Sequence, residues 1–232
     1  AHLGAADCTL ISYNVWFDDV TGAEQRYPAI LGYLGRSSAD LICLQEVTPT
    51  FAIAVEAFAK ASGYQVLFDQ RLPGYGNAVL SKGAITQSEI IALPTRLGRQ
   101  ALRCRTVIGG RSVTVVDCHL DSMPEDTQRR IQQVQVIDRG MSGDCLWLGD
   151  FNFGSDEPEQ AALTRWTDFG AGDAKPTYDP IANALAGRNS FADEPPRRLD
   201  RVLALGSWTL KRYHVDTEVG FSDHYPLVVT VE

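Results

Sequence analysis

The sequence FSDHYP at Phe221–Pro226 stands directly before an apolar segment, Leu227 to Val231, that is typical of a β-strand. The same arrangement recurs along the chain, where a carboxylate, an imidazole or a carboxamide lies at one end of several hydrophobic, strand-like runs. A rigid sheet holds such side chains in fixed positions, which favours an active site at the strand ends. The pattern therefore predicts a functional site assembled from six segments, whose polar residues are Asn14, Gln45 and Glu46, His119, Asp150 and Asn152, Asp200, and Ser222 with Asp223 and His224.

Strand-like and helix-like segments alternate along the chain without a clear linker. The segments 25–35, 49–58 and 124–139 carry apolar residues at helical spacing, and Pro49 fits the first position of its helix. Gly109 and Gly110 predict a hairpin, and 154–196 is the least regular region. These features favour an α/β fold with two packed mixed sheets covered by helices, in one domain over residues 1–232. The expected strands are 9–15, 40–44, 64–68, 77–80, 85–93, 101–108, 112–118, 145–148, 199–205, 208–215 and 225–231.

Composition and charge narrow the classes of function. The chain has 232 residues, of which 44% are hydrophobic, so it can bury a sizeable core and disorder is not expected. Its formal net charge of -8 argues against a protein that holds nucleic acid mainly through a basic surface. A site for phosphate esters stays open, because a metal ion can supply positive charge locally. No apolar run is long enough to predict a membrane span.

The five cysteines are dispersed, and no two form a Cys-x-x-Cys arrangement. Most lie inside apolar, strand-like runs, which predicts reduced, buried thiols in place of a disulfide framework or a zinc site. Reduced cysteines favour a cytoplasmic protein. Residues 1–7 lack a basic region followed by an apolar segment, so no secretory signal is expected in this form. The cysteines are Cys8, Cys43, Cys104, Cys118 and Cys145.

Three acidic or amide residues are candidates for metal and water chemistry. Glu46 would suit a hard cation such as Mg²⁺, because such cations prefer oxygen ligands. The alternative, equally open for this residue taken alone, is that Glu46 is an exposed carboxylate in a turn. Asp150 and Asn152 flank Phe151, and in an extended chain their side chains would share one face. A carboxylate there can activate a water molecule that the carboxamide orients. The alternative is a plain turn, since Gly, Asp and Asn all form turns.

Two of the four histidines, His119 and His224, lie at strand ends. A lone histidine in such a place is more often structural than catalytic. His224, however, follows Asp223 and is expected to lie near Asp200, and a carboxylate partner keeps an imidazole oriented and charged. A charged imidazole can stabilise the negative transition state of phosphoryl transfer. No Gly-x-Ser-x-Gly elbow or Gly-Lys-Ser/Thr phosphate loop competes with this interpretation.

The six segments occur in the order seen in the endonuclease/exonuclease/phosphatase superfamily, which the chain resembles from Thr9 to Val231. The resemblance implies a DNase I-like, four-layered α/β sandwich with two mixed β-sheets flanked by helices. Within the superfamily the chain is most similar to the tyrosyl-DNA phosphodiesterase 2 group and its bacterial and plant relatives. The segments that carry this similarity are ISYNVWF at 11–17, LQEVTP at 44–49, HLDS at 119–122, TYD at 177–179 and RLDR at 198–201.

This resemblance implies a phosphodiesterase that depends on Mg²⁺, for which Mn²⁺ can substitute. The enzyme would act as a monomer on a DNA 5′ end, remove a tyrosyl or other adduct and leave a 5′-phosphate. Roles follow by position: Glu46 would bind the metal directly, with Asn14 and Asp223 near the metal or its waters. Asp150 would position or deprotonate the attacking water, and Asn152 would orient the water and the phosphate. His119 and His224 would contact phosphate oxygens, with Asp200 orienting His224. The residues that would contact the substrate are Asn14, Ser122 and Tyr178.

The chain also departs from the vertebrate members of that group. They carry arginine where this chain has Gly154 and Met123-Pro124, and tryptophan in place of Tyr178. Fewer cations leave a second hypothesis open, a nuclease or phosphatase acting on abasic DNA, nucleotides or another phosphoester. A third hypothesis is a catalytically inactive binding module. The retained set of carboxylates, Asn152 and His224 argues against it.

Overall fold

Two six-stranded mixed sheets pack face to face in the computed structural model, which describes residues 6–69 and 74–232. Residues 1–5, part of the segment in which no secretory signal is expected, lie outside the described residues. The first sheet runs in the order β11 (Leu210–Val215), β12 (Leu227–Val231), β1 (Cys8–Asn14), β2 (Leu41–Val47), β4 (Gly76–Ser81) and β3 (Gln65–Phe68). The second runs in the order β5 (Thr86–Ala92), β6 (Gln100–Ile108), β7 (Arg111–His119), β8 (Cys145–Asp150), β10 (Asp200–Leu205) and β9 (Thr167–Asp168).

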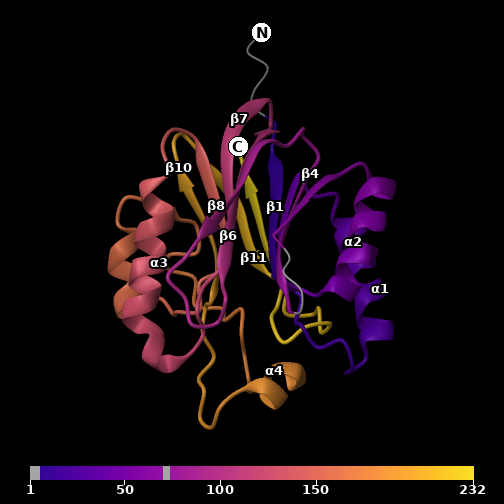
Figure 1. The fold of residues 1–232 in the computed structure, drawn as a ribbon, viewed down its shortest axis with the longest axis vertical. Helices are drawn as coiled ribbons and strands as arrows, with labels where there is room; N and C mark the ends of the chain where they lie inside the picture. Colours follow the sequence, from indigo (N-terminus) through magenta and orange to yellow (C-terminus); the bar gives the residue numbers. More distant parts are fainter. Residues whose placement is uncertain (1–5, 70–73) are drawn as a thin grey trace.

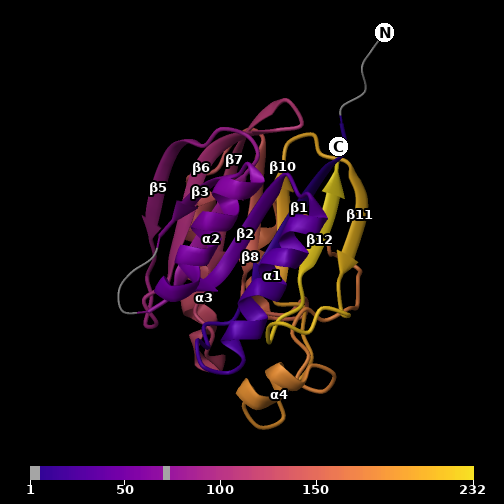
Figure 2. The same cartoon turned by 90° about the vertical axis from the view of Figure 1, so that its right-hand side faces the viewer.

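Helices cover the outer faces of the two sheets (Figure 1). The helices α1 (Ala23–Ser37) and α2 (Pro49–Ser62) lie on the first sheet, and α3 (Thr127–Arg139) lies on the second (Figures 1 and 2). The predicted four-layered α/β sandwich is therefore confirmed. The short helix α4 (Ala184–Asn189) lies at the lower end of the molecule in both views.

Local sequence signals fix several element boundaries. Thr48 caps α2, where its hydroxyl accepts a hydrogen bond from the Phe51 amide at 3.1 Å, and Pro49 opens the helix as predicted. Gly109 and Gly110 have φ values of 58° and 78° and form the two-residue turn between β6 and β7. The helix expected over 124–139 is interrupted, because a 3₁₀ turn, η1 (Pro124–Asp126), precedes α3. A second 3₁₀ segment, η2 (Pro158–Leu163), lies in the irregular region.

Alternation along each strand divides the core into three layers. In β1, Leu10 belongs to the core between the sheets, whereas Ile11 and Tyr13 pack toward α1 and α2. In β8, Leu146 and Leu148 face the space between the sheets, and the intervening side chains pack toward α3. Both faces of the central strands are thus buried, which explains their nearly continuous apolar sequences.

The residues that continue the inner rows to one end of the sandwich are polar. Each polar residue lies an even number of positions after a core residue of its own strand, and therefore on the same face. These pairs are Leu10 and Asn14, Val115 and His119, and Leu148 and Asp150. Each polar side chain thus faces the space between the two sheets. Asp200 lies opposite Asp150 in the antiparallel register of β10 and β8. The same period-2 pattern that builds the core therefore delivers these polar groups to one edge.

The five cysteines are free and buried, which confirms the prediction of buried thiols. Burial raises the pKa of the Cys43 thiol well above its ordinary value, so this group is neutral at physiological pH.

Over residues 6–69 and 74–232, no helix is both long and apolar enough to cross a membrane.

A buried ion pair anchors the segment after β8. Asp168 accepts hydrogen bonds from Arg198 at 2.8 and 2.9 Å and from Arg201 at 2.8 Å, and Arg201 also donates to the Phe153 carbonyl at 3.0 Å. Burial alone would raise the pKa of Asp168, but hydrogen bonds from Arg198 and the charge of Arg201 outweigh it and hold the pKa below its usual value. The buried Arg201 guanidinium thus depends on this carboxylate for its charge partner.

We expect Asp168→Asn to lower the free energy of unfolding at pH 7 by about 3 to 5 kcal/mol, because two buried guanidinium groups lose their shared carboxylate. The folded-state pKa of Asp168 lies below the unfolded one, so its contribution is present above about pH 4 and is lost as the pH falls through the folded value. Urea denaturation at pH 7 and at pH 3 measures both effects. A variant as stable as the wild type at pH 7 would contradict this role.

Candidate active site

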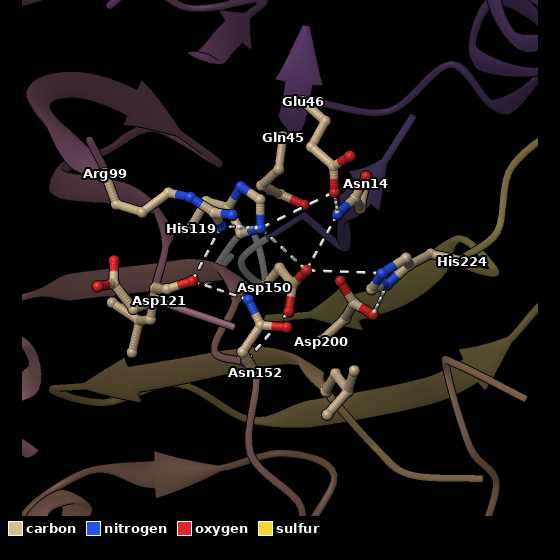
Figure 3. A network of polar contacts seen from close by, with 12 residues as sticks. Asn14, Gln45, Glu46, Arg99, His119, Asp121, Asp150, Asn152, Asp200 and His224 are labelled. Carbon is tan, nitrogen blue, oxygen red and sulfur yellow. Dashed lines mark hydrogen bonds and ion pairs between the residues drawn. The ribbon is translucent and has the colours of Figure 1, made fainter. Parts of the chain in front are cut away.

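Asp150 lies at the centre of a buried polar cluster at one end of the sandwich (Figure 3). Its Oδ2 atom accepts a hydrogen bond from Asn14 Nδ2 at 3.0 Å. The same oxygen lies 3.5 Å from His119 Nε2 and 3.6 Å from His224 Nε2. Burial raises the pKa of Asp150 to about 6, although the positive charge of His224 opposes the shift. A carboxylate with such a pKa is suited to accept a proton near neutral pH.

Glu46 reaches this cluster through an irregularity in β2. Strict alternation after Cys43 and Leu44 would direct the Glu46 side chain toward the helices. The register between β2 and β4 instead shifts between Leu44 and Val47, and Glu46 adopts a left-handed backbone with φ 59°. Its carboxylate therefore turns inward, where it accepts hydrogen bonds from Asn14 and from the Phe17 amide. This local strain is typical of a functional position.

Asn152 also departs from the expected geometry. The prediction that 150–152 is extended is wrong, because Asn152 has φ 55° and its amide turns back to Asp150 Oδ1 at 3.1 Å. Its side chain donates to the Leu120 carbonyl at 2.8 Å, which links the end of β8 to the segment after β7. The carboxamide still lies beside Asp150, so the pairing of the two groups holds although the backbone differs (Figure 3).

His224 is held by Asp200, as the sequence predicted, with Nδ1 2.7 Å from Asp200 Oδ2. Burial by itself lowers the pKa of His224, but the charges of Asp200 and Asp150 outweigh it and hold the pKa well above its ordinary value. The ring is therefore a buried imidazolium at neutral pH. Its Nε2 atom lies toward Asp150 Oδ2 (Figure 3), and His224 also lines the adjoining cavity.

Arg99 is a site residue that the sequence did not reveal. Its guanidinium donates to His119 Nε2 and, at 3.0 Å, to the Leu120 carbonyl. Burial lowers the pKa of His119 well below its ordinary value, and the charges of Arg99 and His224 lower it further, so His119 is neutral. Arg99 directly precedes β6. Because β6 runs antiparallel to β7, β6 begins beside the end of β7, where His119 lies. A polar residue just before a strand was the available signal.

The remaining predicted residues lie around the same cavity. Asp223 is buried and accepts hydrogen bonds from Asn189 at 3.0 Å and from the Ser222 hydroxyl at 3.3 Å. Ser122 lines the cavity wall. Tyr178 also lines it but is only 5% exposed, and its ring lies 5.1 Å from His224, so the ring supports the imidazole from behind. Gln45 is turned away, because it donates to the buried Asp117 at 2.8 Å between the sheets.

The donor set fits a hard divalent cation. Glu46, His119 and Asp150 present ligand atoms within 4.8 Å of one another. Burial raises the pKa of Asp223 to about 7, with the charge of His224 opposing and that of Glu46 adding to the shift. Several buried carboxylates thus share one cavity, and oxygen ligands of this kind suit Mg²⁺. A cation at Glu46 would offset their mutual repulsion.

The cluster opens into a central cavity of about 200 Å³, which two chambers flank. The small chamber, also about 200 Å³, is lined by Asp69, Tyr75, Asn77, Leu97, Arg99 and Gln100. The large chamber, about 410 Å³, is lined by Ser122, Met123, Asn152, Asp156, Phe191, Pro196 and Arg197, with Glu157 and Arg130 among its other walls. The central cavity shares Arg99 and His119 with the small chamber and Ser122 and Asn152 with the large one. A substrate with a group on each side of a phosphate matches this shape.

The chain is similar in sequence to curated proteins named tyrosyl-DNA phosphodiesterase 2. The chicken protein (Gallus gallus) is 27% identical over 158 residues, which cover 64% of this chain and 42% of that protein. The human protein is 26% identical over 153 residues, covering 62% and 41%. The chain thus spans about two fifths of the length of these relatives.

Solved structures support the fold. The zebrafish (D. rerio) tyrosyl-DNA phosphodiesterase 2 in complex with a single-strand DNA product superposes with a TM-score of 0.84 at 21% identity, covering 98% of this chain and 99% of that one. An endonuclease/exonuclease/phosphatase family protein from Bacteroides thetaiotaomicron gives a TM-score of 0.76 at 18% identity, covering 97% of each chain. The profile of the endonuclease/exonuclease/phosphatase family matches residues 11–224, which is most of the chain. The chain therefore belongs to the endonuclease/exonuclease/phosphatase family.

Proposed function

We propose that this protein is a Mg²⁺-dependent phosphodiesterase that hydrolyses the 5′-tyrosyl linkage of a DNA end and leaves a 5′-phosphate, a step in DNA repair. The observation that carries the proposal is the buried Asp150 carboxylate, placed between the neutral His119 and the charged His224 beside a cavity. The names of the curated relatives support the tyrosyl substrate. The DNA product in the zebrafish structure supports a nucleic acid end.

Asp150 would accept the proton of the attacking water. Its pKa of about 6 leaves it mostly ionised at pH 7 yet still basic enough for this task. Asn152, fixed by Leu120 and by its own backbone turn, would orient the water and a phosphate oxygen. The water would then approach phosphorus from the Asn152 side of the central cavity.

Positive charge would stabilise the phosphoryl oxygens from two sides. His224, held charged by Asp200, faces the cavity from one side, and Arg99 faces it from the other. Preorganised donors of this kind act strongly in a buried site, because the transition state needs no solvent rearrangement. His119 accepts a hydrogen bond from the Arg99 guanidinium and so helps to hold it in place.

The leaving group would depart into the small chamber. Attack from the Asn152 side places the departing oxygen on the opposite side of phosphorus, where Arg99 and Tyr75 lie. The Tyr75 ring stacks on Phe17 with centroids 5.0 Å apart, and the Arg99 guanidinium lies 5.5 Å from the Tyr75 centroid. An aryl group such as a tyrosine side chain matches these aromatic and cationic walls. The nucleoside would occupy the large chamber.

Glu46 and Asp223, with Asn14 beside them, would hold the Mg²⁺, and Mn²⁺ would substitute for it. The bound ion would supply positive charge beside a phosphoryl oxygen. The proposed working unit is a monomer.

We expect Mg²⁺ at about 100 times its Kd to stabilise the wild type by about 2.7 kcal/mol, which corresponds to a rise in Tm of about 5 to 10 °C for a chain of this size. Glu46→Gln keeps the shape of the side chain but removes its charge, so the rise should disappear. Differential scanning fluorimetry with and without Mg²⁺ measures it. The control, Glu56→Gln on the exposed face of α2, should respond like the wild type. An equal Mg²⁺ response in Glu46→Gln would contradict the metal assignment.

A panel of substrates separates the proposal from other members of the family. It contains a 5′-phosphotyrosyl oligonucleotide, an abasic duplex, a nucleoside monophosphate and a small aryl phosphodiester, each with Mg²⁺ and with chelator. We expect the phosphotyrosyl oligonucleotide to be turned over fastest. Faster turnover of the abasic duplex or of the monophosphate would favour a nuclease or a phosphatase instead.

A further inference from the structure

Arg130 and Arg197 supply the two guanidinium groups that line the large chamber, and two carboxylates share that of Arg197. Arg197 donates to Glu157 Oε2 at 3.1 Å and to Glu194 Oε1 at 2.9 Å. Its side chain is only 19% exposed. Two negative charges against one positive charge leave this wall acidic, so Arg197 has little capacity to bind a phosphate as well.

The other charged groups of the chamber add to this imbalance. Arg130 is 2% exposed, and its guanidinium is bound by Glu159 at 2.8 Å and by the carbonyl oxygens of Asp121 and Met123. Asp156 lines the chamber, is exposed, and pairs with no cation among residues 6–69 and 74–232. The lining groups and their direct partners thus include two more carboxylates than guanidinium groups.

Such a chamber is unsuited to a long nucleic acid strand. Single strands gain affinity mainly because the protein neutralises their phosphates. For each phosphate neutralised, the slope of log K against log salt concentration is about −0.7. A second phosphate in the large chamber would share it with Asp156, and like charges repel each other. Arg99 lies beside His119 and lines the central cavity and the small chamber, but it does not line the large chamber.

The chamber walls do suit one nucleoside. Met123, Phe191 and Pro196 supply apolar surface, and Asn152 and Ser122 supply polar groups next to the central cavity. Its volume of about 410 Å³ falls within the range of about 300 to 1,000 Å³ of small-molecule pockets. Resting on the function proposed above, we infer that the site recognises the scissile phosphate and one nucleoside only, so that lengthening the strand beyond that nucleoside does not raise kcat/KM.

A length series tests this inference. The substrates are 5′-phosphotyrosyl thymidine, the corresponding dinucleotide and an octanucleotide, and kcat/KM is measured with Mg²⁺ at about 20 and 200 mM monovalent salt. The three values should agree within about threefold, and low salt should not favour the octanucleotide. An octanucleotide preferred by tenfold or more at low salt, with the preference lost at high salt, would overturn the inference while the proposed function stands. Lack of turnover for all three would instead overturn the proposed function, and the inference with it.

Asp156→Arg tests the electrostatic cause. Asp156 is exposed and has no ion-pair partner among the described residues, so its replacement should leave the fold intact. At low salt the ratio of kcat/KM for the octanucleotide to kcat/KM for 5′-phosphotyrosyl thymidine should be about three- to tenfold higher in the variant than in the wild type. Glu56→Arg, on the exposed face of α2, changes the net charge equally and should leave this ratio unchanged. An unchanged ratio in Asp156→Arg, or an equal change in both variants, would contradict the inference.

Discussion

Asp150→Asn should lower kcat about 10²- to 10⁴-fold while KM stays within a few-fold of the wild type. The substitution keeps the size of the side chain and removes the proposed base. A loss of kcat of this size is expected when general-base catalysis is removed. Burial raises the pKa of the Asp150 carboxyl to about 6. The wild-type rate should therefore fall as the pH drops through about 6, because the protonated carboxyl cannot accept a proton.

Two controls separate a catalytic effect from loss of folding. A neutral carboxamide avoids the desolvation of a buried charge, so the variant should unfold at a Tm no lower than that of the wild type. The residual activity should also lose the acidic limb of the pH profile. A variant that retains the wild-type kcat, or that keeps the same acidic limb, would show that Asp150 is not the base.

His224→Gln should lower kcat about 10²- to 10³-fold, the range found when one preorganised donor to a developing negative charge is removed. Asp200→Asn is the more informative variant, because it leaves the imidazole in place. Burial lowers the pKa of His224, and Asp200 supplies the largest opposing effect. Without this carboxylate the pKa falls, so the charged ring is lost at a lower pH.

The alkaline limb of the pH–rate profile should thus move to lower pH in Asp200→Asn, and at the acidic end of the profile the variant's rate should approach that of the wild type at the same pH. NMR titration of the His224 ring gives the pKa directly. Asp216→Asn is the matched control, because this carboxylate contacts Tyr33 on the far side of the first sheet. An alkaline limb that stays in place in Asp200→Asn would contradict a charged His224.

The layered fold and much of the site could be predicted because both follow from alternation. Leu10 and Asn14 lie on the same face of β1, so a sequence that shows the apolar row also shows where the polar end of that row points. The pairing of His224 with Asp200 could be predicted because both residues lie at strand ends. Asp200 is the first residue of β10, and His224 precedes the last strand at the same edge.

The features that could not be predicted depend on local backbone breaks. Glu46 enters the site only because a bulge and a left-handed φ reverse its direction, and Asn152 turns through a left-handed conformation as well. Glu46 is not a glycine, so nothing in the sequence indicates its conformation, whereas Asn152 is a turn-forming residue and its turn was the stated alternative. Arg99 was missed because its place beside His119 depends on the antiparallel pairing of β6 with β7. Long-range register of this kind cannot be read from local spacing.

The most direct test of the proposed reaction is hydrolysis of a 5′-phosphotyrosyl oligonucleotide in ¹⁸O-labelled water, with Mg²⁺ or with chelator, followed by mass spectrometry of both products. The proposed mechanism predicts Mg²⁺-dependent release of free tyrosine and a 5′-phosphorylated oligonucleotide, with the ¹⁸O atom on the phosphate. Absence of Mg²⁺-dependent cleavage of this linkage, while another phosphoester is hydrolysed under the same conditions, would contradict it.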